Sequence, residues 1–170
     1  MTGRVEQRTS DFAAECGCSA VRAVIARHDD AVPPPTAVEL YRAFKAPLSL
    51  DLDTDAKRRR FMVSVGRALE AYGHIPAAAE DVFRRLLAAW ESEANPDTDA
   101  LLDARVEIWQ VLDAKNAGDS TRIIDEVDRS LRALLCLAEP DDDSSDLWYS
   151  AGWAAEMLSS EPWPRAPRLI

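Results

Sequence analysis

The sequence predicts an all-α fold, an irregular bundle of about seven helices joined by short loops. Alanine and leucine are abundant while β-branched residues are sparse, which favours helix over sheet. Apolar residues recur with helical spacing in several segments, and prolines or glycines separate these segments. A chain of 170 residues fits one domain. We therefore expect a single helical domain over residues 1–170, with residues 1–9 frayed and residues 160–170 forming an extended, proline-rich C-terminal tail.

The first two helices are delimited by prolines. The first is predicted from Ser10 to His28, before the three consecutive prolines at 33–35. A second, short helix follows and extends through Lys45. Thr36 and Glu39 have the spacing of a capping box, which marks the start of this second helix.

The next two helices have clear apolar stripes. A third helix is predicted to begin at Thr54 as its N-cap and to end at Tyr72, because Gly73 follows directly. Pro76 is expected at the first helical position of the fourth helix. The stripe of this helix follows the i, i+3, i+4, i+7 pattern up to Trp90, which we expect in the core.

The last three helices differ in amphipathicity. Apolar residues cover a wide arc of the fifth helix, 99–116, which predicts a central helix with Trp109 in the core. The sixth helix, within 123–138, shows the clearest separation of apolar and charged residues, and Glu139-Pro140 ends it. A final helix is predicted at 147–159.

The charge of the chain limits the partners that it attracts. The net charge is −10 and the isoelectric point is near 4.7. Such a surface repels free nucleic acid and anionic membranes but attracts a basic protein. High negative charge also keeps a protein soluble, and that alternative accounts for many of these residues.

Several features predict a cytoplasmic bacterial protein. No apolar run approaches the length of a membrane span, and the first ten residues are polar with no apolar segment behind them. Three cysteines, an odd number, do not form the disulfide framework typical of a small secreted protein. Arginine far exceeds lysine and alanine is frequent, a composition associated with GC-rich bacterial genomes.

The sequence contains no recognisable catalytic centre, so we expect neither an enzyme nor a bound cofactor. It has two histidines, His28 and His74, and neither follows a glutamate at the spacing of a di-iron helix pair. No phosphate-binding glycine loop is present. On a helix, the thiols of Cys16 and Cys18 point about 200° apart and cannot share one metal ion. Cys136 lies in an apolar run and is expected in the core.

One part of the sequence suggests a partner-binding surface. An acidic run leads into the last predicted helix, where three aromatic residues follow closely. Buried aromatics anchor protein interfaces, and the acids steer a basic partner. The alternative is that Trp148 and Trp153 only seal the last helix against the bundle. The predicted partner-binding residues are Asp141, Asp142, Asp143, Asp146, Trp148, Tyr149 and Trp153.

Three function hypotheses follow. The first is a small acidic cytoplasmic protein that acts by occluding a basic protein partner, most concretely a bacterial immunity protein or antitoxin. The second is a helical adaptor or structural subunit of a larger assembly. The third is a metal- or thiol-dependent regulator that uses Cys16, Cys18 and His28.

Overall fold

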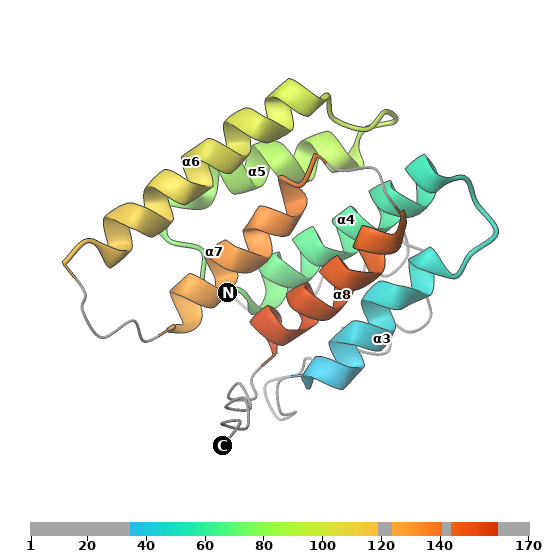
Figure 1. The fold of residues 1–170 in the computed structure, drawn as a ribbon, viewed down its shortest axis with the longest axis horizontal. Helices are drawn as coiled ribbons and strands as arrows, with labels where there is room; N and C mark the ends of the chain where they lie inside the picture. The colour runs from blue at the N-terminus through green and yellow to red at the C-terminus, as the bar shows by residue number, and fades with distance from the viewer. Residues whose placement is uncertain (1–34, 119–123, 141–143, 160–170) are drawn as a thin grey trace, which may run out of the picture.

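The computed structural model describes residues 35–118, 124–140 and 144–159, with the backbone alone at 144–146. These residues form helices and their connections and contain no strand, so the all-α class is confirmed (Figure 1). Six of the seven predicted helices correspond one for one to the observed helices. The helix predicted at 10–28 and the tail at 160–170 lie outside the described residues.

Two helices form the centre of the described bundle. Helix α4 packs against α3, α5, α7 and α8, and α7 packs against α4, α5, α6 and α8. Helices α6 and α3 lie on opposite sides, with α7 and α8 between them (Figure 1). The six helices are α3 (Ala37–Leu48), α4 (Thr54–Tyr72), α5 (Ala77–Glu91), α6 (Thr98–Asn116), α7 (Glu126–Leu137) and α8 (Ser144–Leu158).

The helix starts follow the predicted capping chemistry, with two corrections of one residue. The capping box of α3 is confirmed, because the Glu39 amide donates to Thr36 Oγ1 and the Thr36 amide donates to Glu39 Oε2. Helix α4 is capped by Asp53 and not by Thr54, since the Asp53 carboxylate accepts from the Ala56 amide at 2.8 Å. Pro76 is the N-cap of α5 and not its first helical residue.

The C-terminal end of α7 is held by polar side chains from α4 and α5. Trp90 is fully buried, as predicted, and its indole Nε1 donates to the Leu137 carbonyl oxygen at 2.8 Å. Arg58 is also buried, lies over the Trp90 ring and donates from Nη2 to the Glu139 carbonyl oxygen at 2.5 Å. Terminal helix carbonyls have no partner within the helix, so these two bonds satisfy groups whose burial is otherwise costly.

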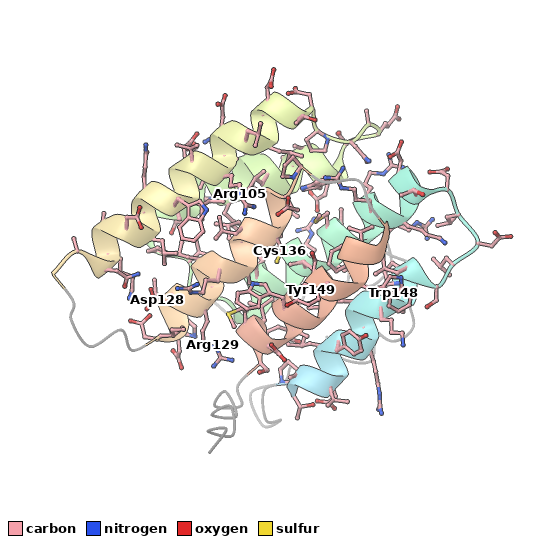
Figure 2. The ribbon with its side chains drawn as sticks, viewed as in Figure 1. Arg105, Asp128, Arg129, Cys136, Trp148 and Tyr149 are labelled. Atoms are coloured by element: carbon pink, nitrogen blue, oxygen red, sulfur yellow. The ribbon has the colours of Figure 1, made fainter. Side chains whose placement is uncertain are left out.

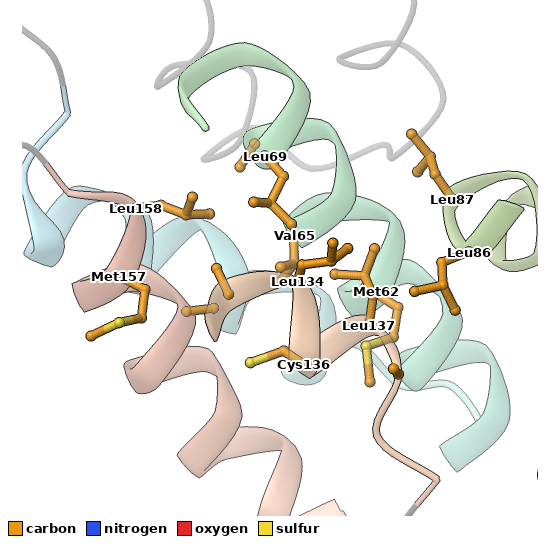
Figure 3. Close-up of a cluster of buried hydrophobic side chains, with 14 of the residues drawn as sticks. Met62, Val65, Leu69, Leu86, Leu87, Leu134, Cys136, Leu137, Met157 and Leu158 are labelled. Atoms are coloured by element: carbon orange, nitrogen blue, oxygen red, sulfur yellow. The ribbon is translucent and has the colours of Figure 1, made fainter. Parts of the chain in front are cut away.

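The core lies where α4, α5, α7 and α8 meet (Figure 3). Gly66 permits the close approach of α4 to its neighbours, because a Cβ there lies only 2.7 Å from Leu87 Cδ1 and 3.2 Å from Leu137 Cδ2. The buried side chains that Figure 3 labels are Met62, Val65, Leu69, Leu86, Leu87, Leu134, Cys136, Leu137, Met157 and Leu158.

Helix α6 is not central, so that prediction is wrong. Its buried stripe consists of Leu101, Ala104, Ile108 and Leu112. A second apolar stripe with i, i+4, i+7 spacing points outward, with exposed fractions of 43% at Leu102, 55% at Val106 and 39% at Trp109. Trp109 is therefore not the core residue that the sequence predicted. The wide arc consists of two stripes, and α5 and α7 cover only one of them.

An ion-pair cluster joins the end of α6 to the start of α7. Lys115 Nζ lies 2.8 Å from Asp125 Oδ2 and 2.9 Å from Asp128 Oδ2. Asp125 and Asp128 also form the capping box of α7. The hydrogen bond from Lys115 lowers the pKa of the Asp125 carboxyl group.

Candidate protein-binding surface

The three aromatic residues predicted to bind a partner lie on α8 (Figure 2 labels two of them). Tyr149 is 81% exposed, the most exposed large apolar side chain among the described residues. Trp148 and Trp153 are half-buried and pack against the core. Both tryptophans therefore help to seal α8 against the bundle, and each still exposes part of its side chain to solvent.

A groove runs between α3 and α8. Val38 and Tyr41 line it from α3, and Trp148, Tyr149 and Trp153 line it from α8. Its volume is about 460 Å³. We call it the α3–α8 groove.

A lysine holds two of the groove's rings in place. Lys45 Nζ lies 5.1 Å from the centre of the Trp148 ring and 5.7 Å from that of Tyr41. Cation–π contacts of this kind link α3 to α8 beside the groove.

A second hollow of about 260 Å³ lies between α6 and α8, bordered by α7; we call it the α6–α8 pocket. Arg105 of α6, Cys136 of α7 and Tyr149 of α8 all line it (Figure 2). Arg105 Nη1 pairs with Glu139 Oε2 at 2.9 Å. Burial, and secondarily the nearby Glu139 carboxylate, raise the pKa of the Cys136 thiol to about 12, so this side chain is uncharged at neutral pH.

Tyr149 and Trp153 line both hollows, so they form the ridge between them. They stand four residues apart, which places them on the same side of α8. The aromatic part of the predicted site is therefore a ridge with a hollow on each side. Sequence reasoning missed the residues that α3 and α6 contribute, although the wide arc of α6 was a signal for Trp109.

The acidic part of the predicted site is described only at its end. Asp141, Asp142 and Asp143 lie outside the described residues, and only the backbone of Asp146 is described, in the first turn of α8. Asp146 precedes Trp148 by two residues, so the acidic run leads directly into the aromatic ridge. Glu156 adds one carboxylate to the lining of the α3–α8 groove.

A third hollow, near the end of α8, has polar groups that already pair with one another. His74 Nε2 lies 3.2 Å from Glu126 Oε2, and the His74 amide donates to Ser130 Oγ. Arg129 Nη2 donates to the carbonyl oxygens of Glu156 and Ser159 at 2.6 Å each. These contacts join the ends of α4, α7 and α8, and they give the hollow a structural role.

The structure does not test the hypothesis of a metal- or thiol-dependent regulator. Across residues 35–118, 124–140 and 144–159, no three histidine, cysteine, aspartate or glutamate side chains gather as metal ligands. Cys16, Cys18 and His28 lie outside these ranges. Among the same residues, no helix combines the length and apolar character that crossing a membrane requires.

Comparison with models of known protein families, with curated proteins and with solved structures gives no match for this chain.

Proposed function

We propose that this chain is a binding protein and not an enzyme, and that it occludes a basic protein partner with the aromatic ridge of α8. The observation that carries the proposal is Tyr149, an almost fully exposed aromatic ring between two hollows. Tyrosine and tryptophan are enriched among the residues that contribute most to interface affinity. The hollows on either side provide concave surface into which partner side chains insert.

The acidic run that precedes the ridge supports a basic partner. Asp141, Asp142, Asp143 and Asp146 immediately precede the ridge in a chain of net charge −10. Complementary charge at the rim of an interface accelerates encounter and selects against acidic competitors.

An immunity protein or antitoxin in the bacterial cytoplasm is the most concrete form of this proposal. Small size and strong negative charge suit a protein that covers the active face of a basic toxin. An adaptor in a larger assembly is the second candidate. The exposed stripe of Leu102, Val106 and Trp109 on α6 favours it, because a second apolar face allows a second partner to dock.

The first experiment identifies the partner by its dependence on the ridge. Affinity purification from the native host is carried out with wild-type chain, with Tyr149→Ser and with the matched control Leu50→Ser, an exposed apolar residue in the α3–α4 connection. We expect a basic protein that wild type and the control retain and Tyr149→Ser loses. Equal retention by all three baits contradicts the ridge.

The second experiment tests the acidic run with that partner. Association rates are measured at low and high salt for a variant with Asn at positions 141, 142, 143 and 146. The control carries Asn at four exposed aspartates elsewhere, Asp51, Asp55, Asp99 and Asp113. We expect slower, less salt-dependent association for the first variant only, because steering depends on where the charge lies. If both variants associate equally slowly, the overall charge of the chain, and not the acidic run, determines the association rate.

A further inference from the structure

The α6–α8 pocket contains more positive than negative side chains, although the chain as a whole is strongly acidic. Arg105 and Arg132 line it together with one carboxylate, Glu139. Arg105 pairs with Glu139. Arg132 lines the same pocket and has no ion pair among the described residues. An anion in the pocket would pair with the Arg132 guanidinium through charge-assisted hydrogen bonds.

Apart from Ser150, the other residues that line the pocket are aromatic or apolar, and none carries a charge. Trp109 lines it from α6, and Tyr149 and Trp153 line it from α8. Leu135 and Cys136 contribute from α7, and the high pKa of the buried thiol keeps its sulfur neutral. Aromatic rings prefer offset or edge-to-face contact with another ring. The body of a fitting ligand is therefore flat and aromatic.

The volume and the charge of the pocket restrict the class of ligand that fits it. The volume of about 260 Å³ is below the range of about 300–1,000 Å³ typical of pockets for drug-sized molecules, which suits one or two fused rings. The Arg132 guanidinium, which has no ion pair among the described residues, balances one negative charge, and the net charge of −10 disfavours multivalent anions.

We propose that the α6–α8 pocket binds a small aromatic carboxylate, with Arg132 pairing the carboxylate and Trp109 and Trp153 contacting the ring. This inference goes beyond the proposed function, because the ligand binds the isolated chain without a protein partner. Tyr149 borders the site, so a bound ligand changes the surface that the ridge presents.

The experiment titrates the full chain with 2-naphthoate and follows the indole NH signals by two-dimensional NMR. The neutral comparison ligand is 2-naphthalenemethanol, which has the same rings without the charge. Among the indoles of Trp90, Trp109, Trp148 and Trp153, we expect saturable shifts of Trp109 and Trp153 with naphthoate. Trp90 reports on the core and stays unchanged, because its NH is bonded to Leu137.

Variants at Arg132 test the ion pair. Arg132→Gln is expected to weaken naphthoate binding at least about tenfold, within the range of charged hydrogen bonds. Arg132→Lys retains charge and is expected to recover part of the affinity. Arg60→Gln is the matched control, because Arg60 is exposed on α4 and has no ion pair among the described residues. Thermal melting of each variant confirms that it is folded.

Three outcomes overturn the proposal. Equal affinity for the alcohol and the carboxylate shows an apolar hollow with no role for Arg132. Unchanged affinity in folded Arg132→Gln places the anion elsewhere. Absence of saturable shifts at millimolar naphthoate means that the pocket has no such ligand, and this result leaves the protein-binding proposal untouched.

Discussion

Helices α6 and α7 lie side by side and are both rich in apolar residues, yet their surroundings differ. Four helices pack against α7, and Leu131, Leu134 and Leu137 on it are fully buried. Helix α6 packs against α5 and α7, which leaves a complete apolar stripe facing outward. The comparison shows that the width of an apolar arc does not distinguish a central helix from a peripheral helix with an exposed apolar stripe.

The polar groups of α7 also differ in how many partners they have. The first and last turns of α7 are held by side chains of neighbouring helices, Lys115 at one end and Trp90 with Arg58 at the other. On the pocket side, Arg132 of α7 lines the same hollow as Arg105 and Trp109 of α6 and has no ion pair among the described residues. The α4-facing side of α7 is thus closely packed, and a hollow remains on the other side, between parts of α6, α7 and α8.

The largest expected difference between the two helices concerns leucine truncation. Leu134→Ala on α7 should lower the free energy of unfolding by about 2–5 kcal/mol, because it leaves a cavity among buried neighbours. Leu102→Ala on α6 should change it by less than about 0.5 kcal/mol, since that side chain is substantially exposed. Urea unfolding followed by circular dichroism measures both. Equal losses contradict the central position of α7.

A second prediction compares two tryptophans. Trp90→Phe removes the donor to the buried Leu137 carbonyl and should cost about 1–3 kcal/mol of unfolding free energy. Trp109→Phe serves as the control and should be close to neutral for stability, because Trp109 is partly exposed on the pocket wall. A larger loss from Trp109→Phe in the same urea experiment reverses the assignment of core and surface.

Local sequence patterns predicted most of the fold. The capping box at Thr36 and Glu39 depends on four consecutive residues and was found as expected. The caps of α4 and α5 shifted by one residue, because Asp53 and Thr54 both suit an N-cap and only the folded backbone selects one. The position of α6 was not predictable, since both of its stripes are apolar and only tertiary packing determines which is covered.

The candidate site was predicted in part. The aromatic residues of α8 stand close in sequence, so Tyr149 and Trp153 were found together. Tyr41, Arg105 and Arg132 come from three other segments, and they meet α8 only through the packing of the bundle. Without long-range contacts a sequence does not reveal which distant side chains complete a hollow.

A third, smaller effect concerns the link between α6 and α7. The pKa of the Asp125 carboxyl group is lower in the folded chain than its unfolded value near 3.8. The ionised carboxylate therefore stabilises the fold above that unfolded value. This stabilisation is lost as the pH falls through the lower pKa of the folded chain. Lys115→Met removes the main cause of that shift. We expect a lower melting temperature than wild type at neutral pH, and a gap that narrows below pH 4. A gap that does not depend on pH contradicts the ion pair.

The smallest effect is expected at the ridge. Tyr149→Ser should change the free energy of unfolding by no more than about 0.5 kcal/mol, because the ring is mostly in solvent. Urea unfolding of this variant beside Leu134→Ala completes the comparison of exposed and buried positions. A loss of several kcal/mol instead means that the ring supports the fold.

The dissociation rate of the partner from Tyr149→Ser tests the central claim most directly. The claim is that the exposed ring serves binding and not stability. Dissociation is measured on immobilised chain for wild type, Tyr149→Ser and Leu50→Ser, using the partner that the affinity purification identifies. The account predicts dissociation at least about tenfold faster for Tyr149→Ser with unchanged unfolding, and a wild-type rate for Leu50→Ser. A wild-type dissociation rate for Tyr149→Ser contradicts the account.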